Sequence, residues 1–229
     1  MIYGEHGFFC SGGDLNTIRS LTNDNNIDDD GNNGGSKMII LMQHNLTRLA
    51  ALPLITMAFV EGMALGGGAE LMAACDYRLA TNSAKIGFVQ VHVGITTVWG
   101  GGPRLVQIIG YGKALSMLAT GKIISSSEAA EIGFVDHIVE ADSILPGSSD
   151  NNRQIQEQQR LKILEHSKQF LQPFLSIPRE ILLPAKLMAS EARNSLSQAF
   201  QREAYHALKV WGGPIHQKAL YRKVNHIKK

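Results

Sequence analysis

The chain has few cysteines, little net charge and no long apolar run, and each of these absences excludes a class of protein. Its two cysteines, Cys10 and Cys75, cannot form the disulfide framework of a small secreted domain and are not spaced like metal ligands, so we expect a reducing compartment and no metal site. The net charge of +2 argues against a general nucleic-acid binder. No apolar stretch reaches the ~20 residues of a membrane-spanning helix, and no signal peptide is visible. We therefore expect neither a nucleic-acid nor a membrane partner.

The 229 residues, of which 44% are hydrophobic, are enough for one large domain or one domain with an appendage. Alternating strand and helix patterns are followed, from Gln154 onward, by helical patterns alone. The sequence therefore predicts an α/β core over residues 1–140 and a linker with a C-terminal helical region over residues 141–229. Residues 23–36 are acidic and glycine-rich, which indicates a surface insertion in the core.

Local patterns predict the individual elements of the core. Asp14 is placed to cap a helix beginning at Leu15, and the C-terminal helices should break near Pro173 and Pro178. Amphipathic and capping patterns predict helices over residues 37–49, 69–75, 103–109, 113–120 and 125–132, and apolar β-rich runs predict strands over 54–60, 76–80, 85–88 and 134–139.

The most informative segment is Ala64–Glu70 (ALGGGAE), which follows the apolar run 54–60. It indicates a buried strand, a tight glycine turn and a helix that begins on the glycines. The first N–H groups of such a helix have no intrahelical partner, so the turn can bind an anion or stabilise negative charge on a carbonyl oxygen. Glu70 places a carboxylate within one turn of that point. The alternative is that the glycines only permit close packing.

Four segments, in order, carry a resemblance to a known family: Phe9–Leu15 (FCSGGDL), Ala64–Glu70, Cys75–Ala80 (CDYRLA) and Gly94–Leu105. Together they resemble the enoyl-CoA hydratase/isomerase (crotonase) superfamily over about Tyr3 to Val139. Within that superfamily, the chain most resembles the branch that decarboxylates ethylmalonyl-CoA. The residues that carry this closer resemblance are Gly94-Ile95, Trp99-Gly100-Gly101 and Val210–Pro214.

The resemblance implies a crotonase-like (ClpP/crotonase) β-β-α spiral core with C-terminal helices that mediate trimers, so a homotrimer or hexamer is expected. The N-terminal segment of the family that helps to hold CoA is expected to be missing before Met1, and a core strand pair with it. The resemblance and the two cysteines favour the cytosol, and a mitochondrial location stays open because the N-terminus looks incomplete.

The same resemblance assigns an oxyanion hole to two backbone N–H groups. These are the N–H groups of Ser11 and of Gly67, the middle glycine of the triplet. Hydratases of the family use two glutamates, one at the position of Glu70 and one four residues before the glycine that matches Gly94. In this chain the second position is Gln90, and an amide cannot exchange a proton at neutral pH, which disfavours hydration.

Decarboxylation of a 2-carboxyacyl-CoA, ethylmalonyl-CoA or also methylmalonyl-CoA, fits the residues that remain. The thioester itself accepts the electrons, so no cofactor is expected, and the reaction would serve as metabolite proofreading in fatty-acid metabolism. Glu70, the third catalytic candidate, either donates a proton to the enolate or, when ionised, repels the substrate carboxylate. A position on the helix surface, without a catalytic role, is the alternative.

Four residues are candidates for substrate binding. Gly66 lies beside Gly67 in the glycine turn, and Gln90 and His92 are candidates to bind the substrate carboxylate, although a single histidine between valines is more often structural. Trp99 is either an apolar wall for the short alkyl branch or a plain core residue. Two other functions compete with decarboxylation: another crotonase reaction such as enoyl-CoA isomerisation, with Glu70 carrying the proton, and acyl-CoA binding by a non-catalytic fragment.

Overall fold

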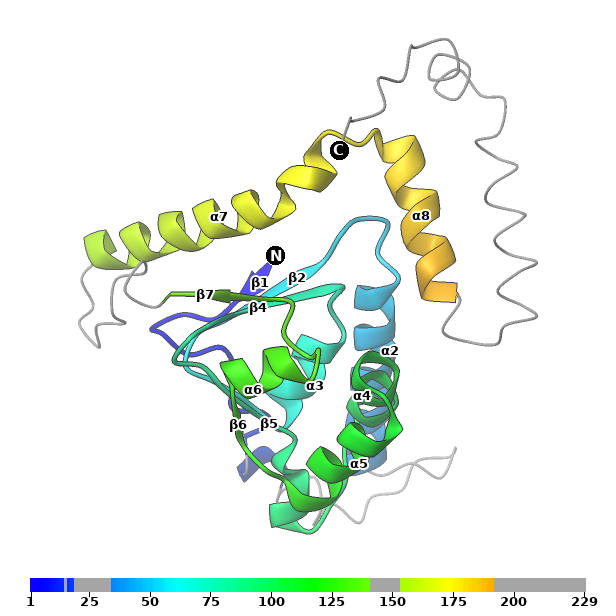
Figure 1. The fold of residues 1–229 in the computed structure, drawn as a ribbon. Coiled ribbons are helices and arrows are strands. Elements are labelled where there is room, and N and C mark those ends of the chain that lie inside the picture. The colour runs from blue at the N-terminus through cyan, green and yellow to red at the C-terminus, as the bar shows by residue number, and fades with distance from the viewer. Residues whose placement is uncertain (15, 19–33, 141–152, 192–229) are drawn as a thin grey trace. The chain divides into compact units, whose positions relative to one another are not determined.

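The computed structural model describes residues 1–14, 16–18, 34–140 and 153–191 (Figure 1). Its contacts divide the chain into two compact units, residues 1–170 and 171–229. The first unit therefore extends past residue 140, where the sequence predicts the end of the core, and includes most of helix α7 (Arg153–Leu175).

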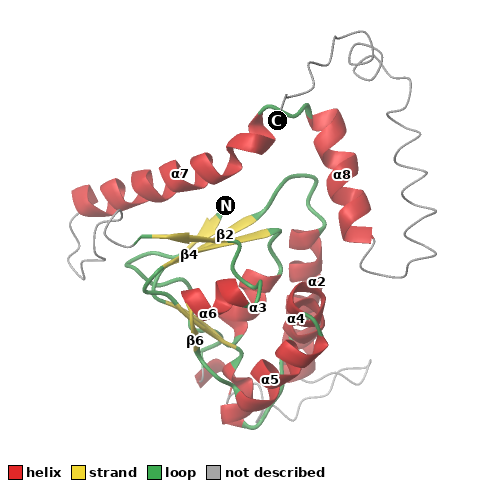
Figure 2. Ribbon diagram, viewed as in Figure 1, coloured by secondary structure: helices red, strands yellow, loops and turns green. Residues whose placement is uncertain are grey.

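Two small sheets form the frame of the first unit (Figure 2). The first has the strand order β1-β2-β4-β7 and is parallel throughout. The second has the order β3-β5-β6, with β3 parallel and β6 antiparallel to β5. The strands are β1 (Ile2–Tyr3), β2 (Met57–Val60), β3 (Met63–Leu65), β4 (Tyr77–Thr81), β5 (Lys85–Gly87), β6 (Ile124–Ser125) and β7 (His137–Val139).

Successive turns of the chain give one strand to each sheet and then a helix. Strand β2 is followed by β3 and helix α3, and β4 is followed by β5 and three helical segments, while α6 connects β6 to β7. This repetition confirms the predicted α/β spiral of β-β-α turns. The helices are α2 (Gly34–Ala50), α3 (Gly67–Ala73), the 3₁₀ helix η1 (Val89–Val93), α4 (Gly101–Ile109), α5 (Tyr111–Thr120), α6 (Ser126–Glu131), α7 and α8 (Arg179–Glu191).

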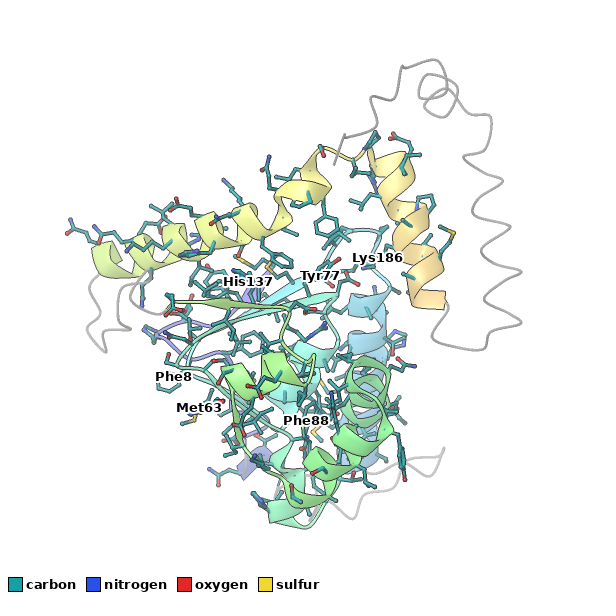
Figure 3. The ribbon with its side chains drawn as sticks, viewed as in Figure 1. Phe8, Met63, Tyr77, Phe88, His137 and Lys186 are labelled. Atoms are coloured by element: carbon teal, nitrogen blue, oxygen red, sulfur yellow. The ribbon has the colours of Figure 1, made fainter. Side chains whose placement is uncertain are left out.

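The core combines apolar residues of both sheets with the buried faces of α3 and α4. All four residues of β2 are buried, and Phe88, which Figure 3 places in the interior, packs edge-on against Phe134 with ring centroids 5.7 Å apart. Each such side chain contributes about 1.5–3 kcal/mol when fully buried. Because Met72 and Ala73 of α3 belong to this core, the start of α3 at the glycines is held in place.

Aromatic contacts join the first unit's part of α7 to the edge of the first sheet. The ring of Phe170 lies 5.2 Å from that of Tyr77 on β4 and 5.9 Å from that of His137 on β7, centroid to centroid. Within the ranges that the structure describes, no helix has the length and apolarity needed to cross a membrane.

Most predicted elements are confirmed. The break predicted near Pro173 falls two residues later, because α7 ends at Leu175 and Pro173 lies in its last turn. The break at Pro178 is confirmed, since α8 begins at the next residue. The linker 141–152 and the Val210–Pro214 segment lie outside the described residues, as does the insertion 23–36 except for its last three residues, which begin α2.

Candidate active site

The glycine turn joins β3 to α3 and lies against the second sheet. Gly66 has φ of +54°, a backbone conformation that side chains other than glycine rarely adopt, and its N–H donates to Gly87 O at 2.9 Å. Helix α3 then begins at Gly67, and both glycines are buried. The predicted strand, turn and helix over Ala64–Glu70 are therefore confirmed.

The segment that contains Ser11 runs directly alongside this turn. Cys10 pairs with Ala64 as an isolated parallel bridge, and its carbonyl accepts from Leu65 N at 3.0 Å. Gly12, at φ of +102°, is so close to the turn that a Cβ on it would lie 3.1 Å from Gly67 N. The structure thus brings the chain around Ser11 and the glycine turn together at one corner, which we call the glycine corner (Ser11, Gly12, Gly66 and Gly67).

Two backbone N–H groups of the glycine corner are available to a ligand oxygen. Neither Ser11 N nor Gly67 N donates a hydrogen bond to any residue that the structure describes. Gly67 is the first residue of α3, where backbone N–H groups have no intrahelical acceptor. A buried N–H without a partner costs free energy, and a carbonyl or enolate oxygen would satisfy it.

Glu70, one turn into α3, has its carboxylate enclosed by hydrogen-bond donors. Its side chain is only 1% exposed. Oε1 accepts from Gln90 Nε2 at 2.8 Å and from Val98 N at 3.4 Å, and Oε2 accepts from Trp99 N and Gly101 N, both at 2.8 Å. Glu70 is therefore not a helix-surface residue, which excludes the alternative considered from the sequence.

The loop before α4 is wrapped closely around this carboxylate. A Cβ on Gly101 would overlap Glu70 Cγ, so glycine is required for the loop to approach. Gly101 is also the first residue of α4, and the positive end of that helix dipole therefore adds to the stabilisation of a negative charge on Glu70. Each oxygen of the Glu70 carboxylate thus accepts two hydrogen bonds from N–H donors.

Gln90 completes the polar surroundings of Glu70 but is itself only partly satisfied. Its Nε2 donates to Glu70, while its Oε1 is buried and has no hydrogen-bond partner among the described residues. The residue is 8% exposed and lies on η1, directly after β5. An unpaired buried carbonyl oxygen is uncommon in folded proteins.

Trp99 lies across the glycine corner. A Cβ on Gly67 would overlap Trp99 Cζ3 and lie 2.5 Å from Cη2, and a Cβ on Gly13 would lie 3.9 Å from Cζ2. The Trp99 backbone is held on both sides, because its N–H donates to Glu70 and its carbonyl accepts from Arg104 Nη1 at 2.9 Å. Its indole Nε1 is buried without a partner in the part of the chain that the structure describes.

The structure does not bring His92 to this group. Its side chain is exposed, and Nε2 lies 3.2 Å from Thr120 O, at the C-terminal end of α5. This placement agrees with the structural role considered for a histidine between valines. The other predicted site residues, Ser11, Gly66, Gly67, Glu70, Gln90 and Trp99, all lie at the glycine corner or on the loop and helix around Glu70.

Sequence reasoning missed the residues that hold the loop before α4. Gln43 Nε2 donates to Val98 O at 2.9 Å, and Arg104 donates to Thr47 Oγ1 at 3.2 Å as well as to Trp99. One signal was present in the sequence: Arg104 falls in the first turn of α4, where a cation is unfavourable next to the helix dipole, so its presence there indicates another role.

Two cavities of the first unit lie away from the glycine corner. One, of about 300 Å³, is lined by residues that include Glu5, Glu61 and Arg160, and burial there raises the pKa of Glu61 above its usual value. Another, of about 430 Å³, is lined by residues of α5 and α6. Over the described ranges, no cluster of three or more His, Cys, Asp or Glu side chains is arranged to hold a metal ion.

Comparisons with known proteins show which family the chain resembles. A family model described as enoyl-CoA hydratase/isomerase matches residues 1–177. The chain is 37% identical to ethylmalonyl-CoA decarboxylase of Danio rerio, over 99% of the chain and 68% of that protein, and 35% identical to the protein of the same name from Rattus norvegicus, over 100% of the chain and 69% of that protein. The structure of an enoyl-CoA hydratase from Bacillus anthracis aligns with a TM-score of 0.74 at 25% identity, over 95% of this chain and 74% of that one.

Proposed function

The chain belongs to the enoyl-CoA hydratase/isomerase family, and we propose that it is a carboxy-lyase that removes CO2 from a 2-carboxyacyl-CoA thioester such as ethylmalonyl-CoA or methylmalonyl-CoA. One observation carries this choice of reaction. The side chain that contacts the Glu70 carboxylate is the amide of Gln90, not a second carboxyl group. Two relatives that cover nearly the whole chain are named ethylmalonyl-CoA decarboxylase, which supports the same choice.

The proposed chemistry uses the free N–H groups of the glycine corner. The thioester oxygen accepts hydrogen bonds from Ser11 N and Gly67 N. The bond between carbon 2 and the carboxylate then breaks and CO2 leaves. The electron pair of that bond forms the thioester enolate, and a proton from water is delivered to carbon 2 to complete the acyl-CoA product. Because the thioester accepts the electrons, the reaction needs no metal and no organic cofactor. One oxyanion donor is typically worth about 2.7–4 kcal/mol of activation free energy.

Hydration is disfavoured by the same geometry. Adding water to an enoyl thioester requires one group that activates the water and one that protonates carbon. Gln90 can do neither at neutral pH, and Glu70 already accepts four hydrogen bonds from N–H donors.

The physiological role that we propose is metabolite proofreading. A 2-carboxyacyl-CoA arises when a carboxylation reaction acts on the wrong acyl-CoA, and decarboxylation returns that compound to an ordinary acyl-CoA of fatty-acid metabolism. The proposed reaction consumes such a compound directly and without a second substrate.

The deciding experiment incubates the purified full chain with ethylmalonyl-CoA. We expect CO2 and butyryl-CoA in equal amounts, and no hydration of crotonyl-CoA under the same conditions. Hydration or double-bond isomerisation in place of decarboxylation would overturn the proposal, and binding of butyryl-CoA without any turnover would favour a non-catalytic acyl-CoA-binding protein.

Ser11 offers a matched pair of variants for this experiment. Ser11→Ala keeps the backbone N–H and should decarboxylate at the wild-type rate, whereas Ser11→Pro removes that N–H and should lower the rate roughly 10²–10³-fold. Circular dichroism and melting temperature would confirm that both variants are folded. A large loss in Ser11→Ala would instead assign the reaction to the hydroxyl group.

A further inference from the structure

The carboxylate of Glu70 accepts hydrogen bonds from the backbone of a neighbouring loop and so holds that loop in place. Three of its four hydrogen bonds come from the main chain of one short loop, at Val98, Trp99 and Gly101. Charge-assisted bonds of this kind are about twice as strong as neutral ones. The loop backbone over residues 98–101 therefore takes its position from Glu70.

The consequence of this anchoring is a fixed position for Trp99. Its N–H is held by Glu70, its carbonyl is held by Arg104, and Arg104 is in turn bonded to Thr47 on α2. Gly100, with φ of +85°, turns the chain immediately afterward. With both neighbouring peptide groups held, the indole has little freedom other than its two side-chain torsions.

The indole lies where an acyl chain bound at the glycine corner would begin. Its Cζ3 and Cη2 atoms occupy the space beside Gly67 Cα that a Cβ would fill, which is next to the Gly67 N–H. A thioester oxygen on that N–H is two bonds from carbon 2, so a branch on carbon 2 meets the six-membered ring of the indole. The backbone of Gly12 lies close to Gly67 N, and the backbone of Gly13 lies close to the indole.

We propose that Trp99 determines the size of the alkyl branch that the glycine corner accepts, and that Glu70 acts through Trp99 as a positioning residue rather than as a proton donor. The inference rests on the proposed function only in that the ligand is an acyl-CoA thioester. In an apolar pocket, one methylene more or less typically changes the discrimination between two substrates roughly 10- to 200-fold.

Acyl-CoA esters that cannot lose CO2 test the proposed role of the Trp99 indole separately from catalysis. The alkyl branch of a 2-carboxyacyl-CoA becomes the acyl chain of its product, so propionyl-, butyryl-, hexanoyl- and octanoyl-CoA form a graded series. Calorimetry should show that wild-type affinity falls between butyryl- and hexanoyl-CoA. In Trp99→Ala the ratio of hexanoyl to butyryl affinity should rise roughly tenfold or more. In Trp99→Phe, which keeps a smaller ring, it should rise less.

The outcomes of this series are distinct. The same affinity ratio in the wild type and in Trp99→Ala would overturn the role of Trp99 and leave the proposed function intact. Binding of acyl-CoA with the expected ratios, but without release of CO2 from ethylmalonyl-CoA, would overturn only the proposed function. Failure of the wild type to bind any acyl-CoA would overturn both.

Glu70→Gln tests the positioning role. The amide has a single acceptor oxygen, and its NH2 group would face two of the N–H donors, so the loop should lose its fixed position. We expect the chain-length preference to move toward that of Trp99→Ala, while the remaining decarboxylation keeps the wild-type pH profile. A changed pH profile with unchanged chain-length preference would instead make Glu70 the proton donor.

Fluorescence gives an independent reading of the same loop. The chain has two tryptophans, so a Trp211→Phe background leaves Trp99 as the only emitter. In that background Glu70→Gln should broaden the lifetime distribution of Trp99, and Gln107→Ala, a change on the same helix α4 as Arg104, should not. Identical lifetimes in Glu70→Gln and its background would contradict an anchoring role for the carboxylate.

Discussion

Gln90 donates a hydrogen bond from Nε2 to Glu70 Oε1 at 2.8 Å inside the protein, while its own Oε1 has no partner among the described residues. In this pair both carboxylate oxygens of Glu70 accept hydrogen bonds, whereas only the NH2 group of the Gln90 amide has a partner. This asymmetry matters for function, because the amide adds polarity beside Glu70 without adding a second titrating group.

Gln90→Glu should convert this pair into two competing carboxyl groups. Both cannot be ionised at hydrogen-bond distance in a buried site, so the pair should retain one proton and titrate with a raised apparent pKa. A group whose folded pKa is raised stabilises the fold at low pH and loses that contribution as pH rises. We therefore expect a lowered melting temperature at pH 7 that recovers toward pH 5, together with slower decarboxylation.

Gln90→Leu is the control for this prediction. It removes the N–H donor without adding a charge, and the lost bond to a charged group should cost about 1.5–3 kcal/mol. The deficit should not change between pH 5 and pH 7. If the deficit of Gln90→Glu were equally independent of pH, the two carboxyl groups would not share a proton.

Gly67→Ala should destabilise the protein through Trp99 alone. The substitution keeps the backbone N–H, but the new Cβ would overlap the indole, and overpacking of this kind typically costs about 1–3 kcal/mol. In a Trp99→Ala background the same change should cost little. Urea unfolding of the four proteins of this double-mutant cycle measures the coupling, and equal costs in both backgrounds would place the indole away from Gly67.

The sequence predicted the part of the site that depends on residue type. Glycines at positions 66 and 67, a carboxylate one helical turn later and an amide at position 90 each leave a recognisable pattern. The donors that enclose Glu70 leave none, because a backbone N–H is common to almost every residue. The placement of His92 also needed the structure, since only three-dimensional packing shows that its ring lies beside Thr120 O.

The same distinction, between local sequence patterns and contacts made in three dimensions, explains which parts of the fold could be predicted. Periodicity and capping patterns predicted α2 and α6, because a helix's amphipathic face and its cap are local properties of the chain. Pro173 marked the end of α7 to within two residues, since the helix ends at Leu175. The assignment of β2 and β3 to different sheets is set by long-range pairing that no local pattern contains.

Arg78→Met should be strongly destabilising. Arg78 is buried, forms an ion pair with Asp136 at 2.8 Å, and donates to the carbonyls of Phe134 and Cys75. Removing one partner of a buried ion pair typically costs about 3–5 kcal/mol. The matched control is Lys122→Met, which breaks the exposed pair with Glu128 and should cost about 0–1 kcal/mol. Similar unfolding free energies for the two variants would contradict the prediction.

The cost of Arg78→Met should also depend on pH. Burial raises the pKa of Asp136 above its usual value, and Arg78 is the group that opposes this rise. Without Arg78 the folded protein should favour protonated Asp136, so the variant gains relative stability as pH falls toward the ordinary value of 3.8. The difference in unfolding free energy between wild type and variant should therefore be smaller at pH 4.5 than at pH 7.

Acid should remove a stabilising contribution from the start of α6. Ser125 and Glu128 form a capping box, in which Ser125 N donates to Glu128 Oε2 at 2.9 Å and Ser125 Oγ accepts from Glu128 N at 3.2 Å. The hydrogen bond from Lys122, followed by those from Ser125, lowers the pKa of Glu128 from 4.5 to about 2. A folded pKa below the unfolded one means that the contribution is complete above pH 4.5 and is lost as pH falls toward 2.

Glu128→Gln and Ser125→Ala separate the two parts of this cap. Glu128→Gln removes the charge, so its unfolding midpoint in urea should lie below that of the wild type by a constant amount above pH 5, and the difference should shrink as pH falls from 4.5 toward 2. Ser125→Ala removes the Ser125 Oγ acceptor for the Glu128 N–H and should cost about 1 kcal/mol above pH 5. Parallel stability curves for wild type and Glu128→Gln from pH 2 to 7 would show that the charge of Glu128 contributes nothing to the cap.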